Sequence, residues 1–290
     1  MSNPNWIQRQ RSAAARTSDP GWLLRQAPAP IEATSRFTEL YAHAVNGVLV
    51  LPPGLLVWLA PGIFTQLYPG YFMHIKQHLA RRRVALRTLP GSTVAPLYEA
   101  ANGIREAVLA GPEGAILLGH SKGPLDLHAA LVVHPKVADH VRGFISLQAP
   151  FGGTPLATDA QASRLLRKLA PRSYFEMGYD QRRAFLLEHS PLSPVPTVSL
   201  ATSASRAGWP LEQTRKHLAE THGLASDGFV PLQDAQLPGA QVVKLEGLDH
   251  ASLALRWMRP NAPFHAGAVI EALLALCLET SLGDAPADSP

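Results

Sequence analysis

The chain of 290 residues predicts an α/β fold with a mainly parallel sheet flanked by helices, and two patterns support this prediction. Apolar runs of strand length recur at residues 55–59, 84–87, 115–118, 141–147, 195–200 and 241–245. Helical periodicity lies between or beside them, at residues 37–44, 94–109 and 266–278. Strands that alternate with helices imply right-handed crossovers, which make neighbouring strands parallel.

The composition supports one large folding unit. Hydrophobic residues make up 46% of the chain and charged residues 17%, so a substantial core can be buried. Residues 1–30 are polar, with several Arg and Pro, and predict an N-terminal arm outside the core. Residues 284–290 are rich in Pro, Ala and Asp and predict a disordered tail. The predicted domain is therefore residues 31–283, and its segment 156–194, which has helical stretches but no strand pattern, is expected to form a cap over the site.

Charge and cysteine content exclude some classes of function. The formal net charge is +4, but the arginines are scattered. The run Arg81-Arg82-Arg83 is typical of a solvated face, so we expect no nucleic-acid partner. The single cysteine, Cys277, excludes a disulfide within the chain. Because no apolar segment adjoins the N-terminal arginines as in a secretory signal, we expect a cytoplasmic protein.

One segment raises the question of membrane contact. Residues 40–75 contain no Asp, Glu, Lys or Arg, and their length would allow a membrane span. Pro52-Pro53-Gly54 and Pro61-Gly62 would break a lipid-exposed helix, so we favour a buried strand followed by an apolar loop. Peripheral attachment to a membrane through this segment stays an alternative.

The functional prediction centres on Gly119-His120-Ser121-Lys122-Gly123, a Gly-x-Ser-x-Gly motif. It follows an apolar run and precedes helical spacing, which is the strand-turn-helix pattern that presents a nucleophilic serine. A side chain at either glycine would collide with neighbouring backbone, while the strained turn exposes the serine hydroxyl. The motif alone is short, and its flanks make it more specific.

A serine nucleophile needs a base, and the base needs an orienting acid. Asp227 and His250 both follow predicted strands, whose carboxyl ends meet at one edge of a parallel sheet beside Ser121. Taken alone, an Asp-Gly turn and a loop histidine would be structural features. Asp249 is the alternative acid, but adjacent side chains in an extended segment point to opposite faces, so we favour Asp227.

The oxyanion that develops during acyl transfer needs two backbone N–H donors. Lys122, which follows the nucleophile, is expected to supply one. Ile63 is expected to supply the other, because Gly62 allows a close backbone approach, although Pro61-Gly62 could also be a plain turn.

Large apolar side chains predict a pocket for the acyl or alcohol part of a substrate. The candidate substrate-binding residues are Phe64, Leu67, Tyr68, Phe151 and Phe175. The same kinds of side chain would also suit the core of the cap.

Several motifs occur together in this chain. They are Gly-His-Ser-Lys-Gly-Pro-Leu-Asp (119–126), Pro-Lys-Val-Ala-Asp (135–139), Ala-Pro-Phe-Gly-Gly-Thr-Pro-Leu-Ala (149–157), Ser-Asp-Gly-Phe-Val-Pro (226–231) and Asp249-His250. In combination they resemble the bacterial triacylglycerol lipase group of the α/β-hydrolase superfamily, from about residue 55 to residue 253. The resemblance implies an α/β-hydrolase fold with Ser121, Asp227 and His250 as catalytic triad and Ile63 and Lys122 as oxyanion residues.

The chain departs from that group at three places. Pro61-Gly62 stands where the group has His-Gly, and Pro124 stands where it has glycine. Residues 251–253 lack a counterpart of the calcium ligands that some of these lipases carry, so we expect no metal and no cofactor.

The sequence thus predicts a serine carboxylic-ester hydrolase that forms an acyl-enzyme with a small-molecule or lipid ester. Two alternatives remain open. The same triad would serve an acyltransferase or a thioesterase, and the fold could form a catalytically inactive binding module.

Overall fold

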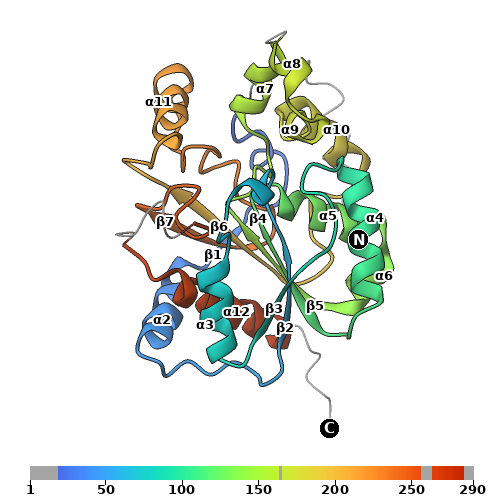
Figure 1. Ribbon diagram of the computed structural model, residues 1–290, viewed down its shortest axis with the longest axis vertical. Coiled ribbons are helices and arrows are strands. Elements are labelled where there is room, and N and C mark those ends of the chain that lie inside the picture. Colours follow the sequence, from blue (N-terminus) through green and yellow to red (C-terminus); the bar gives the residue numbers. More distant parts are fainter. Residues whose placement is uncertain (1–18, 163–164, 256–262, 284–290) are drawn as a thin grey trace.

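The computed structural model describes residues 19–162, 165–255 and 263–283, and these contain a seven-stranded sheet (Figure 1). Its order is β1-β7-β6-β5-β4-β2-β3, and every neighbouring pair of these strands is parallel. The strands are β1 Ile31–Glu32, β2 Leu56–Ala60, β3 Ala85–Thr88, β4 Ala115–His120, β5 Val141–Leu147, β6 Thr197–Ser203 and β7 Gln241–Glu246. The predicted parallel sheet is confirmed, and β1 is an additional short edge strand that periodicity does not detect.

Helices cover both faces of the sheet (Figure 1). One layer consists of α2 Thr34–Val45, α3 Met73–Arg81 and α12 Ala266–Gly283. The other consists of α4 Leu97–Leu109, α5 Gly123–Val133 and α6 Pro135–His140. In β4, Ile116 and Leu118 belong to the first apolar cluster and Leu117 to the second, which is the alternation expected of a strand buried on both faces.

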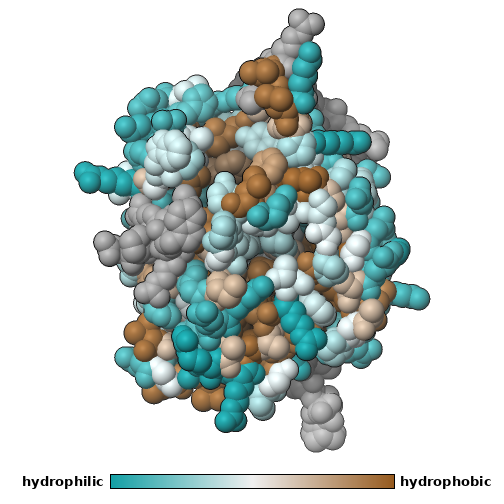
Figure 2. Space-filling model, viewed as in Figure 1, coloured by the Kyte–Doolittle hydropathy of each residue, from teal (hydrophilic) through white to brown (hydrophobic). Residues whose placement is uncertain are grey.

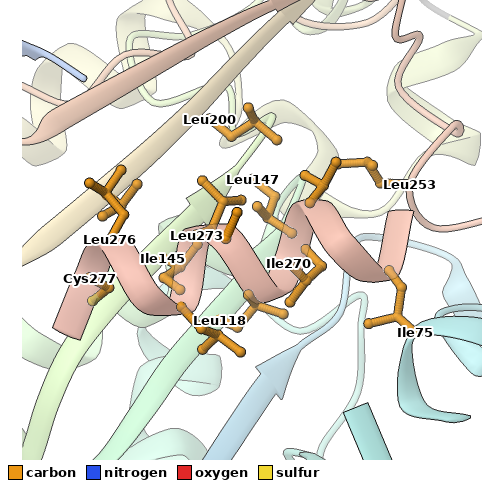
Figure 3. Close-up of a cluster of buried hydrophobic side chains, with 14 of the residues drawn as sticks. Ile75, Leu118, Ile145, Leu147, Leu200, Leu253, Ile270, Leu273, Leu276 and Cys277 are labelled. Atoms are coloured by element: carbon orange, nitrogen blue, oxygen red, sulfur yellow. The ribbon is translucent and has the colours of Figure 1, made fainter. Parts of the chain in front are cut away.

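Helix α12 is the centre of the first layer (Figure 3). Ile270, Leu273 and Leu276 lie over Leu118 and Ile145 of the sheet, and all five belong to one buried cluster. The helix is buried around much of its circumference because it lies between the sheet and helices α2 and α3.

Helical insertions follow β5 and β6. Between β5 and β6 the chain forms α7 Pro155–Ala162, α8 Leu166–Leu169, α9 Arg172–Phe175 and α10 Tyr179–Glu188, and between β6 and β7 it forms α11 Leu211–His222. Helices α7, α8, α9 and α11 lie at the top of Figure 1, beyond the ends of the strands. The helical content predicted for residues 156–194 is thus present, while their action as a cap stays a prediction.

The predicted N-terminal arm needs a correction. Trp22 is 0% exposed and Leu23 is 2% exposed, so this part of the segment belongs to the core. The Trp22 indole N–H donates to the carbonyl of Gly152 at 2.7 Å, and the Gly21 N–H donates to Asp234 Oδ1 at 2.8 Å. The prediction failed because the average polarity of residues 1–30 concealed one large apolar anchor. Residues 1–18 and the predicted tail 284–290 lie outside the described residues.

Residues 40–75 do not form one continuous element. They include the end of α2, the strand β2, the 3₁₀ helix η1 at Thr65–Leu67 and the start of α3. In the described ranges, no helix combines the length and apolar character needed to cross a membrane.

Candidate active site

Ser121 directly follows β4 in a strained backbone conformation. Its φ is 61°, in the left-handed region that residues other than glycine rarely adopt. A Cβ atom at Gly123 would lie 2.1 Å from the carbonyl oxygen of Ala60, and one at Gly119 would lie 2.5 Å from the nitrogen of Pro124. Backbone crowding therefore requires both glycines, as the motif predicted.

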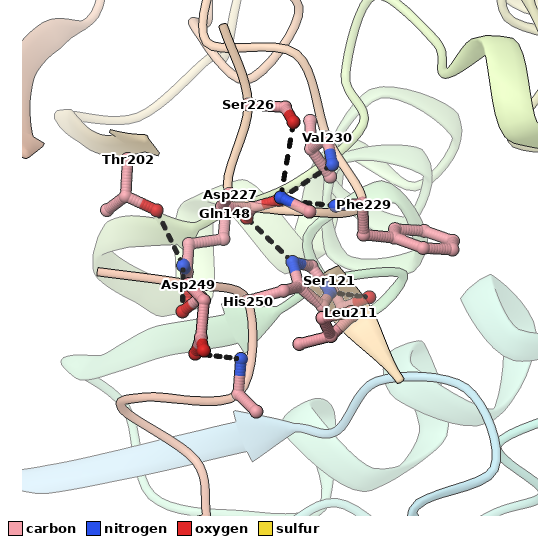
Figure 4. Close-up of polar contacts among 12 residues, drawn as sticks. Ser121, Gln148, Thr202, Leu211, Ser226, Asp227, Phe229, Val230, Asp249 and His250 are labelled. Carbon is pink, nitrogen blue, oxygen red and sulfur yellow. Dashed lines mark hydrogen bonds and ion pairs between the residues drawn. The ribbon is translucent and has the colours of Figure 1, made fainter. Parts of the chain in front are cut away.

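His250 lies between Ser121 and Asp227 (Figure 4). Its Nε2 atom is 2.9 Å from Ser121 Oγ, and its Nδ1 atom is 2.8 Å from Asp227 Oδ2. With Nδ1–H donating to the carboxylate, Nε2 is left to accept the serine proton. The three residues that the sequence selected are thus brought together in the order that general-base activation of a hydroxyl requires.

The loop at 226–231 fixes the position of Asp227, which is 1% exposed. Asp227 Oδ1 accepts hydrogen bonds from the backbone N–H groups of Phe229 at 2.9 Å and Val230 at 2.7 Å. Gly228 makes the turn with a φ of 100°. The loop of His250 is tied to the same place, because the His250 N–H donates to the Asp227 carbonyl at 2.8 Å.

Asp249 faces different partners from those of Asp227. Its Oδ2 atom accepts from the Gly208 N–H at 2.8 Å, and its Oδ1 atom accepts from the Ser252 hydroxyl at 2.6 Å and the Ala251 N–H at 3.2 Å. The side chain is completely buried. These contacts hold the loop that carries His250, whereas the carboxylate at the imidazole is that of Asp227.

A buried hydrogen-bond chain underlies His250. His120 Nε2 lies 3.0 Å from the His250 carbonyl, which can only accept, so this nitrogen carries a proton. Burial lowers the pKa of His120 to about 3, which keeps its ring neutral. Nδ1 therefore accepts from the Tyr71 hydroxyl at 2.9 Å, and the Tyr71 oxygen accepts from the Gly62 N–H at 3.0 Å. The chain joins the loop of Gly62 to the loop of His250.

Local sequence patterns did not identify Tyr71 and Gln148 as partners of His120. Gln148 Oε1 lies 3.2 Å from His120 Nε2, and its amide nitrogen donates to Thr202 Oγ1 at 2.6 Å. Gln148 follows β5 as Ser121 follows β4, and it also has a positive φ, of 51°. A polar residue at the end of a buried strand is the signal that could have found it.

The predicted oxyanion residues lie on either side of Ser121. A Cβ atom at Gly62 would be 3.0 Å from the Ser121 Cβ, so the backbone at residues 62 and 63 passes directly beside Ser121. Lys122 directly precedes α5 as its N-cap residue, and its side chain is held elsewhere, with Nζ 2.7 Å from both carboxylate oxygens of Asp126. Only the backbone of Lys122 is left to face a substrate.

An apolar cavity of about 200 Å³ opens at Ser121. Phe64 and Tyr68, two of the candidate substrate-binding residues, line it, and so does Ile63, which was selected as an oxyanion residue. The large lining residues Tyr174, Leu211 and Phe229 are among those that were not selected from the sequence. Phe229 follows Asp227 by two residues, so the 226–231 motif itself contained that signal.

Three predicted pocket residues lie elsewhere, and these predictions are wrong. Leu67 is 68% exposed, on the outer side of the η1 turn. Phe151 is 0% exposed and packs in the core against His128, with ring centroids 4.8 Å apart. The residue of α9 that lines the cavity is Tyr174, not Phe175, because consecutive helical side chains point in different directions.

Comparisons with known proteins bear on the fold. Neither a protein-family profile nor a curated protein sequence matches this chain. The crystal structure of the metagenomic carboxyl esterase MGS0156 is similar, with a TM-score of 0.75, 20% identity, and coverage of 96% of this chain and 99% of that one. The Staphylococcus hyicus lipase has a TM-score of 0.63 and 9% identity over 81% of this chain and 99% of that one. The mature Bacillus licheniformis lipase BlEst2 has a TM-score of 0.59 and 17% identity over 80% of this chain and 92% of that one. At such identities the likeness concerns the fold, and it confirms that the chain has the α/β-hydrolase fold.

Proposed function

We propose that this protein is a serine carboxylic-ester hydrolase acting on esters with an apolar acyl group. The observation that carries the proposal is the hydrogen-bonded series Ser121, His250 and Asp227 at the base of an apolar cavity. The names of the similar structures, a carboxyl esterase and two lipases, agree with it.

The proposed reaction has two halves. In the first, His250 takes the proton of the Ser121 hydroxyl while Oγ attacks the ester carbonyl, and the backbone N–H groups of Ile63 and Lys122 stabilise the oxyanion. His250 then gives that proton to the departing alcohol. In the second half, His250 takes a proton from water while the water oxygen attacks the acyl carbonyl, and His250 then gives that proton to Ser121 Oγ as the bond between Oγ and the acyl group breaks and the acid leaves. Asp227 orients the ring and stabilises its protonated form in both halves.

The first experiment is activity toward p-nitrophenyl esters from acetate to palmitate, with wild type and Ser121→Ala compared. We expect the variant to lose about 10⁴-fold or more in kcat while its thermal unfolding stays cooperative. A fluorophosphonate probe should label wild type but not the variant. Unlabelled wild-type protein would instead favour the inactive binding module.

Acyl transfer and thioester hydrolysis are the alternatives that share this triad. A small alcohol added to the ester assay competes with water for the acyl-enzyme, so the ratio of new ester to free acid separates transferase from hydrolase. Parallel assays of matched oxygen esters and thioesters test the thioesterase alternative. We expect free acid from the oxygen ester to be the main product.

We also propose peripheral contact with lipid surfaces at the mouth of the cavity. Leu67 and Trp209 do not line the cavity, but they are 68% and 77% exposed and directly precede the lining residues Tyr68 and Pro210. Sedimentation with phosphatidylcholine vesicles should fall for the double variant Leu67→Ser and Trp209→Ser. Val50→Ser is the matched control, because Val50 is 86% exposed in the loop before β2. Equal sedimentation of the double variant and the control would contradict the proposal.

A further inference from the structure

Three side chains with metal-binding atoms meet between α7 and α11. Asp159 Oδ2 lies 3.0 Å from His217 Nε2 and 3.1 Å from His222 Nε2. All three ligand atoms lie within 4.8 Å of one another. None of these residues takes part in the series at Ser121, so the cluster calls for an explanation of its own.

We propose that Asp159, His217 and His222 bind a zinc ion. Two imidazole nitrogens and one carboxylate oxygen form a ligand set that suits Zn²⁺, whereas Mg²⁺ and Ca²⁺ prefer oxygen ligands alone. Bonds of about 2.1 Å in a tetrahedron place the ligand atoms about 3.4 Å apart. The observed distances from Asp159 to the two histidines are within about half an ångström of this spacing, so small side-chain rotations would seat the ion. A water molecule would occupy the fourth position.

The surroundings of the two histidines favour the same role. His217 Nδ1 lies 3.2 Å from the Thr221 hydroxyl, and an Nδ1–H bond to that oxygen leaves Nε2 unprotonated and directed at Asp159. His222 is the last residue of α11, where the unpaired carbonyl ends of the helix favour a cation. The side chains of Asp159 and His217 are 41% and 43% exposed, which gives an ion access from solvent.

The zinc ion would join two helices that are each attached to the loop of Asp227. At the start of α7, the Thr154 hydroxyl donates to the Phe229 carbonyl at 2.7 Å. In α11, the Thr214 hydroxyl donates to the Gly228 carbonyl. The metal would therefore close a ring made of α7, the 226–231 loop and α11. We expect zinc to stabilise this part of the fold without taking part in the chemistry at Ser121.

The decisive measurement is zinc binding by isothermal titration, with the full chain freed of any affinity tag and treated with chelator beforehand. Wild type should bind one equivalent. Asp159→Asn and His217→Gln should each weaken binding by more than about 100-fold, since the loss of a group that merely supports a ligand already costs 10 to 100-fold. His43→Gln, which changes an exposed histidine of α2, is the matched control and should bind as wild type does.

A second variant separates this site from the proposed active site. His250→Gln should still bind one equivalent of zinc, because His250 belongs to a different cluster. Zinc should also raise the unfolding temperature of wild type and of His250→Gln, but not that of Asp159→Asn. The proposal is overturned if wild type binds no zinc, or if Asp159→Asn and His217→Gln bind it as tightly as His43→Gln does. In either case the cluster is a hydrogen-bonded carboxylate between two imidazoles and nothing more.

Discussion

The carboxyl end of the sheet and the layer formed by α12 differ in backbone strain. Five described residues other than glycine have a positive φ, and three of them, Phe64, Ser121 and Gln148, lie in the candidate site. Phe72 belongs to the apolar cluster of the α12 layer, but its ring packs against His120 of the site. The fifth, Arg83, is in the turn before β3. Strained conformations persist only where their surroundings impose them, and they concentrate at functional sites. The difference suggests that the site depends on the rest of the molecule for its shape.

The two regions also bury different kinds of side chain (Figures 3 and 4). Beneath α12 the cluster is apolar, and the buried Glu271 at its border is paired with Arg82 at 2.6 Å and His78 at 2.9 Å. At the carboxyl end, polar residues such as Asp227 and Asp249 are buried together. Substitutions in the first region should therefore reduce stability, and substitutions of the hydrogen-bonded series Ser121, His250 and Asp227 in the second should mainly reduce activity.

Substitution of the buried Asp227 by asparagine should give the largest loss of activity, and the same substitution at the buried Asp249 is its comparison. Asp227→Asn should lower kcat by about 10⁴-fold, because the amide cannot hold the productive tautomer of His250. Asp249→Asn should leave kcat within about tenfold, the scale expected of a group that acts through its neighbours, and should reduce stability instead. Measurement of kcat and of urea unfolding for both variants tests this. The reverse ranking of kcat would transfer the role of the acid to Asp249.

Crowding beside the nucleophile should give the next largest effect. In Gly62→Val the new Cβ would lie 3.0 Å from the Ser121 Cβ and 3.3 Å from the His120 carbonyl, so the backbone at Ile63 must shift. Loss of one oxyanion donor lowers kcat by about 10² to 10³-fold. Gly103→Val in α4 is the control, because a Cβ there meets no atom within 4 Å. Full activity of Gly62→Val would mean that Ile63 is not an oxyanion residue.

Much of the site could be predicted because its chemistry follows strand ends. Ser121 and His250 come directly or shortly after the strands β4 and β7, and the glycines of the elbow have a steric reason that can be read from spacing alone. Asp227 is separated from β6 by helix α11, and the motif at 226–231 is the signal that marks it. The hydrogen-bond chain of His120 and Tyr71 beneath them could not be predicted in this way. Tyr71 reaches His120 from a loop far away in sequence, and only the tertiary structure brings the two together.

The same limit explains the errors in the pocket and at the N-terminus. Local patterns do not tell which side chain of a short helix faces a cavity, so Phe175 was chosen in place of Tyr174. They also do not tell that Trp22 reaches the carbonyl of Gly152 across the fold. Asp159 and His217 are separated by 58 positions, so no local motif links the residues of the proposed zinc site.

A cavity beneath α12 should reduce stability without reducing kcat. Leu273 is 0% exposed in the centre of the apolar layer, and Leu273→Ala should lower the free energy of unfolding by about 2 to 5 kcal/mol. Urea unfolding measures the loss, and kcat is compared at a temperature at which the variant is fully folded. Val48→Ala, at a position that is 63% exposed, should change neither quantity appreciably. A tenfold loss of kcat in folded Leu273→Ala would contradict the proposed division between the two regions.

The smallest effect should come from a buried polar group that lies outside the site. His128 in α5 is 0% exposed, and burial, with the nearby charges of Arg182 and His189 adding to it, lowers its pKa to about 3. The native state therefore keeps the ring neutral, while the unfolded chain takes up a proton below about pH 6.5. The contribution of this histidine to stability is complete above that pH and is lost as the pH falls toward 3.

His128→Leu removes this proton uptake. Between pH 7 and pH 5 the free energy of unfolding of wild type should fall by about 2 kcal/mol more than that of the variant, which follows from one proton taken up by the unfolded chain over that range. The contribution of His120, whose pKa is also lowered, is common to both proteins and cancels in the comparison. Urea unfolding at the two pH values measures the difference. Because His128 touches neither Ser121 nor His250, kcat at pH 7 should be unchanged, and an equal pH dependence of stability in the two proteins would show that His128 is not held neutral in the native state.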